Sequence, residues 1–129
     1  SLLPDAKYVV VATALTPETK GLIDESVFKA MRPDAYFINI ARGAIVDETA
    51  LFKALSDRWI AGAALDTFVT EPLPPDSPFW TLPNVFVTPH CSALSPRLVE
   101  RILNLFLDNL DRYRSGQPLR NVVDKTAGY

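Results

Sequence analysis

The sequence has few of the residues that define several large protein classes: one cysteine, one histidine and no run of lysines or arginines. The single cysteine, Cys91, cannot form an intrachain disulfide, which is typical of a reducing compartment. One histidine and one cysteine at adjacent positions lack the ligand spacing of a metal site. A net charge of −2 over 129 residues provides no basic footprint for nucleic acid. The composition therefore argues against disulfide-stabilised, metal-binding and nucleic-acid-binding classes.

Long apolar runs are also missing, and none approaches the roughly 20 residues that span a membrane. The N-terminal residues have neither the basic nor the apolar region of a signal peptide. We therefore expect a cytoplasmic protein. With 48% hydrophobic and 22% charged residues, the chain has the composition and the length of one globular domain.

Short β-branched runs alternate with helical patterns along the first part of the chain, which predicts an α/β fold with a parallel sheet. The first run is apolar throughout, which is typical of a strand buried on both faces. The predicted strands are Tyr8–Ala14, Tyr36–Ile40, Ile60–Leu65 and Val85–Thr88, and the predicted helices between them are Asp24–Met31 and Asp47–Asp57.

A third helix is predicted at Pro96–Tyr113, where apolar side chains recur on one face. Pro96 suits a first helical turn, Ser95 is the candidate N-cap, and Gly116 is placed to end the helix. We therefore divide the chain into a sheet-containing part, residues 1–95, and a helix with an irregular tail, residues 96–129.

Polar residues that directly follow the predicted strands are the candidates for a functional site, because ligands bind at the carboxyl ends of parallel strands. Arg42 follows the second strand, where a guanidinium can hold a carboxylate through two parallel hydrogen bonds. Gly43 beside it lets the chain turn sharply. Glu71 lies in the loop after the third strand, and His90 follows the fourth.

Each candidate has a simpler explanation when it is taken alone. An isolated arginine is more often part of a surface salt bridge, a lone histidine is more often structural, and a loop glutamate is usually solvated. Together, an anion binder, an orienting carboxylate and a proton carrier suit the interconversion of a 2-keto acid and a 2-hydroxy acid. No side chain supplies a hydride, so this set implies a nicotinamide cofactor.

Several segments, in the same order, resemble motifs of the D-isomer-specific 2-hydroxyacid dehydrogenase family. They are Leu15–Ile23, Asn39–Glu48, Ala64–Pro74, Asn84–His90 and the closing segment Pro118–Val123. The resemblance implies that Arg42 binds the substrate carboxylate and polarises the keto oxygen. It implies that His90 is the acid/base, and that Glu71 holds His90 in place.

For the cofactor, the resemblance implies NAD or NADP. Asp66 would hydrogen-bond the nicotinamide carboxamide, and Ala41 would line the nicotinamide end. Thr19 would lie near the phosphates or ribose, and Thr13, at the carboxyl end of the first predicted strand, is a further candidate contact. The sequence departs from the family after the histidine, where His90-Cys91-Ser92-Ala93 replaces the usual His-x-x-Gly.

A second departure is that the five glycines, at positions 21, 43, 62, 116 and 128, cannot form G-x-G-x-x-G. We therefore expect the C-terminal half of a Rossmann-like NAD(P)-binding domain, inactive in isolation. The helix and tail would return to the substrate domain.

The family usually forms dimers, so we expect a homo-oligomer or association with the other half. A non-catalytic binding or assembly module that keeps the fold is the alternative. The sequence leaves open which 2-keto acid is the substrate, and NAD versus NADP.

Overall fold

The computed structural model describes residues 2–128. Their contacts divide the chain into two compact units, Ser1–Ser92 and Ala93–Tyr129. The first unit contains the sheet, and the second contains one long helix and the tail. Among residues 2–128, no helix combines the length and apolar character needed to cross a membrane.

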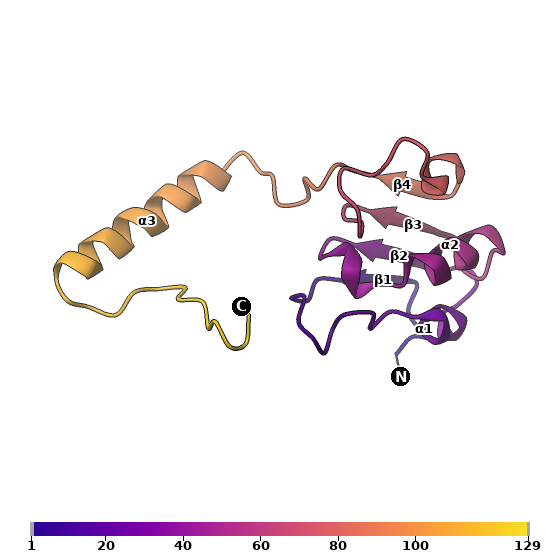
Figure 1. The fold of residues 1–129 in the computed structure, drawn as a ribbon, viewed down its shortest axis with the longest axis horizontal. Coiled ribbons are helices and arrows are strands. Elements are labelled where there is room, and N and C mark those ends of the chain that lie inside the picture. Colours follow the sequence, from indigo (N-terminus) through magenta and orange to yellow (C-terminus); the bar gives the residue numbers. More distant parts are fainter. Residues whose placement is uncertain (1, 129) are drawn as a thin grey trace. The chain divides into compact units, whose positions relative to one another are not determined.

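The first unit is built on four parallel strands that lie side by side in chain order (Figure 1), which confirms the predicted α/β fold. Val11 pairs with Asn39, and Asn39 pairs with Leu65, so the strands end level with one another. The residues that follow the strands therefore share one edge of the sheet. The strands are β1 (Tyr8–Val11), β2 (Tyr36–Asn39), β3 (Gly62–Leu65) and β4 (Val85–Val87).

Two helices pack against each other in this unit, α1 (Glu25–Ala30) and α2 (Glu48–Ser56). Each begins after an aspartate whose carboxylate accepts two backbone N–H bonds, Asp24 for α1 and Asp47 for α2. These caps satisfy amide groups that have no partner inside the helix. Both predicted helices are confirmed, and the predicted ranges include the capping residues.

The core lies where the helices meet the sheet, and Phe28 of α1, Phe37 of β2 and Leu55 of α2 are fully buried. The prediction that the first strand is buried on both faces was wrong. In β1, Val11 is buried, but Tyr8 is 61% exposed and Val10 is 52% exposed. A continuous apolar run shows that a strand can be buried on both faces. Whether other elements cover both faces depends on the tertiary structure, which the run does not determine.

The second unit contains α3 (Leu98–Arg114). The prediction that it begins at Pro96 with a Ser95 cap was wrong. Its N-cap is Arg97, which provides no side-chain hydrogen bond, and Ser95 contributes only its carbonyl, which accepts the Leu98 N–H at 3.0 Å.

The predicted end of α3 at Gly116 is confirmed. Gly116 has a φ of 68°, in the left-handed region that favours glycine. Its N–H donates to the Tyr113 carbonyl at 3.3 Å, and the Gln117 N–H donates to the Arg112 carbonyl at 2.8 Å. This bond pair closes the last turn of the helix.

Two short 3₁₀ helices, η1 (Gly43–Ile45) and η2 (Pro78–Thr81), were not predicted. Segments of three and four residues are too short for a hydrophobic period to indicate them. η1 lies between β2 and α2, directly after the candidate residue Arg42, and η2 lies in the loop between β3 and β4.

Candidate functional site

Asp66, the first residue after β3, is a buried carboxylate with three hydrogen-bond donors around it. Its Oδ1 accepts the Thr88 hydroxyl at 2.5 Å and the Cys91 N–H at 2.9 Å, and its Oδ2 accepts the Ser92 N–H at 2.9 Å. Burial alone would raise the pKa of Asp66. The hydrogen bonds from Ser92 and Thr88 outweigh burial and hold this pKa far below its ordinary value. The carboxylate therefore stays ionised inside the protein.

The bonds to Asp66 fix the turn that carries His90. His90 has a φ of 50°, a left-handed conformation that is unfavourable for a residue with a Cβ. Its N–H donates to the Asp66 carbonyl at 2.9 Å, and the next two N–H groups donate to the Asp66 carboxylate. Asp66 thus stabilises an uncommon backbone conformation and sets the direction of the imidazole.

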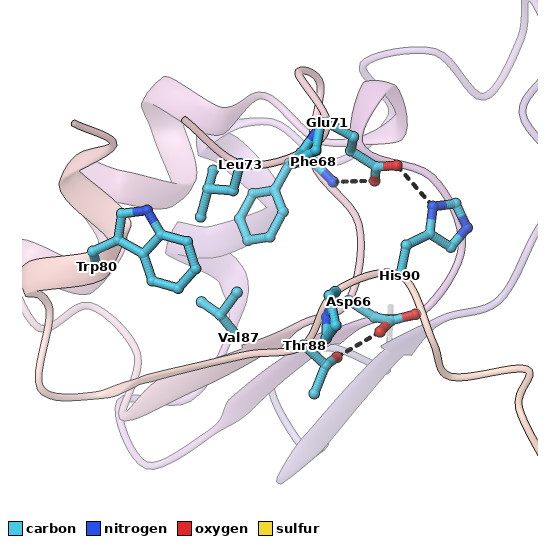
Figure 2. Close-up of a pocket in the computed structure, with 10 residues that line it drawn as sticks. Asp66, Phe68, Glu71, Leu73, Trp80, Val87, Thr88 and His90 are labelled. Carbon is cyan, nitrogen blue, oxygen red and sulfur yellow. Dashed lines mark hydrogen bonds and ion pairs between the residues drawn. The ribbon is translucent and has the colours of Figure 1, made fainter. Parts of the chain in front are cut away.

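His90 and Glu71 form the hydrogen bond that the sequence predicts. The distance from His90 Nδ1 to Glu71 Oε2 is 2.7 Å, and the Phe68 N–H donates to Glu71 Oε1 at 2.9 Å (Figure 2). Burial alone would raise the pKa of Glu71. The hydrogen bonds from His90 and the Phe68 N–H outweigh burial and, with a contribution from the Arg42 charge, hold this pKa below its ordinary value. Because ionised Glu71 can only accept, Nδ1 carries the proton and Nε2 of neutral His90 is left with a lone pair.

A cavity of about 590 Å³ adjoins this pair. Figure 2 shows its apolar wall of Phe68, Leu73, Trp80 and Val87 on one side, with the free ring nitrogen of His90 directed away from that wall. Trp80 is fixed by its Nε1–H, which donates to the Pro74 carbonyl at 2.8 Å.

Arg42 is exposed and does not line this cavity, although the sequence groups it with Glu71 and His90 in one candidate site. Its Nη1 donates to the Ala41 carbonyl at 2.6 Å, and within residues 2–128 its other four N–H donors make no hydrogen bond. The guanidinium therefore retains its capacity to bind an anion, and its charge reaches the Glu71 carboxylate.

Asn39, at the end of β2, is a site residue that the sequence reasoning missed. Its buried side chain accepts the Ala41 N–H at 3.0 Å and donates to the Arg42 carbonyl at 3.2 Å. The amide thereby fixes the loop that carries Arg42. A polar residue at the end of an apolar strand was the available signal, because a buried amide must find partners in the adjoining loop.

Gly43 serves a different purpose from the predicted sharp turn, since its φ is not positive. A Cβ at this position would lie 1.9 Å from the Phe68 carbonyl carbon and 2.3 Å from the Val69 nitrogen. Gly43 is required because two backbone segments touch there. One of these segments carries Arg42, and the other carries Glu71.

The two threonines predicted to contact the cofactor lie in the segment after β1. Thr13 is exposed. The Thr19 hydroxyl donates to the Ala14 carbonyl at 2.7 Å and accepts the Thr16 N–H at 2.7 Å, so it organises its own turn. The cofactor contacts of both residues stay predictions.

The parallel sheet, with the His90–Glu71 pair at its carboxyl edge, has a Rossmann-like dinucleotide-binding architecture. The NAD-binding domain of the D-isomer specific 2-hydroxyacid dehydrogenases matches residues 1–92. The chain therefore belongs to the D-isomer specific 2-hydroxyacid dehydrogenase family.

Two curated relatives illustrate the similarity. A glyoxylate reductase from Korarchaeum cryptofilum is 38% identical over 96% of the chain, and a glyoxylate/hydroxypyruvate reductase A from Photorhabdus laumondii is 40% identical over 100%. The chain spans about 37% of the length of each.

Solved structures show the same fold. A family member from Xanthobacter autotrophicus in complex with NADPH and MES has a TM-score of 0.88 at 41% identity, covering 99% of this chain and 54% of that one. A glyoxylate/hydroxypyruvate reductase from Sinorhizobium meliloti in complex with NADP and sulfate has a TM-score of 0.89 at 37% identity, covering 98% of this chain and 41% of that one.

Proposed function

We propose that this chain supplies the acid–base and substrate-binding residues of an NAD(P)-dependent reductase of small 2-keto acids, such as glyoxylate or hydroxypyruvate. The observation that carries the proposal is the bond between His90 Nδ1 and Glu71 Oε2 at 2.7 Å. This bond fixes the imidazole ring and leaves Nε2 free to exchange a proton with a substrate oxygen.

In the reducing direction, His90 starts protonated on both nitrogens and donates the Nε2 proton to the keto oxygen. The ionised Glu71 stabilises the positive imidazole before this transfer and keeps the proton on Nδ1 after it. The nicotinamide supplies the hydride when it is bound. His90 takes the proton back when the 2-hydroxy acid is oxidised.

Arg42 binds the substrate carboxylate in this proposal. Four of its donors are unused within residues 2–128, and a guanidinium holds a carboxylate through two parallel bonds. Two such bonds orient the keto carbon as well as bind it. The names of the relatives from Korarchaeum and Photorhabdus support a substrate as small as glyoxylate or hydroxypyruvate.

The residues at this edge fit the nicotinamide end of the cofactor. Asp66 accepts three hydrogen bonds in the structure, and a carboxylate has about four acceptor sites. One acceptor site therefore remains for the carboxamide N–H, with Ala41 lining the same end and Thr13 and Thr19 as weaker candidates. The exposed apolar residues of β1 and α3 support association with a second copy or another polypeptide.

A chimera tests the function. Residues 1–129 would replace the matching part of the Photorhabdus reductase, and NADPH and NADH oxidation would be followed with glyoxylate and hydroxypyruvate. We expect turnover that His90→Ala lowers by roughly 10²–10⁴-fold. Glu71→Gln should also lower turnover, because an amide can donate to Nδ1 and favour the wrong tautomer. Asp76→Asn, an exposed acid in the same loop, should leave the rate unchanged.

A correctly folded chimera that is no more active than its His90→Ala variant would contradict the proposal. It would favour the alternative, a binding or assembly module that keeps the dehydrogenase fold.

A further inference from the structure

The segments that carry Arg42 and Glu71 are joined by a hydrogen bond that the proposed mechanism does not use. Glu48 is the first residue of α2, and its Oε1 accepts the Val69 N–H at 2.7 Å across 21 residues of sequence. Bonds to a charged acceptor are among the strong ones in proteins. The carboxylate thus connects the start of α2 to the loop after β3.

A second contact joins the same two segments. The backbone of Gly43 lies against the backbone of Phe68 and Val69, with no room for a Cβ between them. The loop after β3 is therefore held at two points, by contact at Gly43 and by the hydrogen bond to Glu48. We call this pair of contacts the Glu48–Gly43 clamp.

The clamp acts on the residues that orient the catalytic pair. The Phe68 N–H donates to Glu71 Oε1, and Glu71 Oε2 accepts the Nδ1 proton of His90. Val69, whose N–H is bound by Glu48, directly follows Phe68. The Phe68 N–H lies one peptide unit before the Val69 N–H, so a shift of the backbone at Val69 would also displace the donor that fixes the Glu71 carboxylate.

We propose that Glu48 is a positioning residue, which holds the loop so that Glu71 can accept from His90 Nδ1. Because Arg42 begins the segment that contains Gly43 and Glu48, the clamp also sets the distance between the anion-binding guanidinium and the acid–base pair. The importance of that distance for turnover rests on the proposed function. The effect of the clamp on the orientation of His90 is independent of the proposed function.

The simplest competing explanation is that Glu48 only stabilises α2 through the helix dipole. The chain provides a matched comparison, because α1 also begins with an Asp-Glu pair, Asp24 and Glu25. Glu25 forms ion pairs with Lys29 at 2.5 Å and Lys53 at 4.0 Å at the surface. Glu25 therefore shares the helical position of Glu48 without a bond to the loop after β3.

The test reads the tautomer of His90, which is the only histidine, by ¹⁵N NMR of the 129-residue chain at pH 8. The variants are Glu48→Gln, which keeps the acceptor oxygen, and Glu48→Asp, which keeps the charge but shortens the reach. Glu25→Asp is the control. Both substitutions at Glu48 are compatible with a first helical turn, and the backbone amide spectrum checks the fold.

We expect the Nδ1-protonated form to predominate in the wild type and in Glu48→Gln and Glu25→Asp. In Glu48→Asp, this fraction should fall by about half or more, since the solvated imidazole is not held to one tautomer. The Val69 amide should exchange with solvent at least about tenfold faster in that variant, because its partner is out of reach.

Three results would overturn the proposal: wild-type behaviour of Glu48→Asp, an equal loss in Glu48→Gln, or an equal loss in Glu25→Asp. The first would show that the bond does not hold the loop, the second that charge rather than an acceptor matters, and the third that the effect is general loosening. None of these readings involves substrate, so failure of the proposed reductase activity would be seen separately, in the chimera.

Discussion

The two compact units of the chain use amphipathic helices in opposite ways. In the first unit, the apolar side of α2 lies in the hydrophobic core, and Leu55 is 0% exposed. In the second unit, α3 has a comparable apolar stripe, but none of its residues is buried among those that the structure describes. Leu103 of α3 is 53% exposed and Phe106 is 60% exposed.

The difference shows that periodicity and burial are separate properties. A repeat of apolar residues every three or four positions determines that a helix has an apolar face. A partner for that face must come from another element. Stability should therefore depend strongly on apolar residues in the first unit and weakly on those in the second.

The largest effect should come from removing buried side chains in the first unit. Leu55→Ala should lower the free energy of unfolding by about 2–5 kcal/mol, because it leaves a cavity in the core. Leu103→Ala should change it by less than about 0.5 kcal/mol. Urea unfolding followed by tryptophan fluorescence measures this unit specifically, since Trp59 and Trp80 are the only tryptophans and both lie in it.

An equally large loss for Leu103→Ala would break the comparison. It would show that the apolar stripe of α3 is covered in solution. Repeating the measurement at several protein concentrations would then distinguish a second copy from packing within one chain, because only the former depends on concentration.

Two glycines give the next comparison. Gly43→Ala places a Cβ 1.9 Å from the Phe68 carbonyl carbon, and we expect a loss of about 2–3 kcal/mol from the forced shift of backbone. Gly116→Ala meets open space and is disfavoured only by its positive φ, which costs about 1 kcal/mol. The first variant should also weaken the His90–Glu71 bond, and a Gly43→Ala protein as stable as Gly116→Ala would contradict the close backbone contact.

The sequence was sufficient to predict the order and type of the main elements. Short β-branched runs and capped amphipathic segments are local signals, and Asp24 and Asp47 mark the starts of α1 and α2 directly. The sequence was insufficient for β1, where Tyr8 and Val10 are exposed. An apolar run looks the same whether one face of the strand is covered or two.

The site was predictable where parallel strands bring residues to one edge. His90 and Glu71 meet for that reason, since each follows a strand of the same sheet. The bond from the Val69 N–H to Glu48 could not be predicted, because it depends on how two loops stack rather than on any spacing. The contact at Gly43 is of the same kind, and only its tertiary neighbours show why a glycine is required.

The acid sensitivity of the first unit should depend on its buried carboxylate. The folded-state pKa of Asp66 is lowered, so Asp66 contributes stability that is present above the ordinary pKa of aspartate, near 3.9. That contribution is lost as the pH falls from there through the folded-state pKa. Between about pH 5 and pH 2, the unfolding free energy of Asp66→Asn should therefore decrease by about 1–2 kcal/mol less than that of the wild type.

Glu71 also has a lowered pKa, so part of the acid sensitivity should remain in Asp66→Asn. The control is Asp124→Asn in the second unit. Hydrogen bonds from the Ala127 and Thr126 amides lower the pKa of Asp124, but the group is exposed. Asp124→Asn should leave the pH dependence of the unfolding free energy, followed by tryptophan fluorescence, unchanged. A reduction equal to that in Asp66→Asn would show that the acid sensitivity belongs to the whole chain.

The smallest expected effect concerns the start of α3. Its N-cap, Arg97, provides no side-chain hydrogen bond, and a positive charge at a helix N-terminus opposes the helix dipole. Arg97→Asp should stabilise α3 by about 0.5–1 kcal/mol, because a carboxylate can accept the free amides and favours the dipole. Since no residue of α3 is buried among those described, this local gain should appear as higher helical circular dichroism on heating, while tryptophan-detected unfolding stays unchanged. If Arg97→Asp also raised the unfolding midpoint of the first unit, the two units would be energetically coupled, and the exposed stripe of α3 would have a partner in solution.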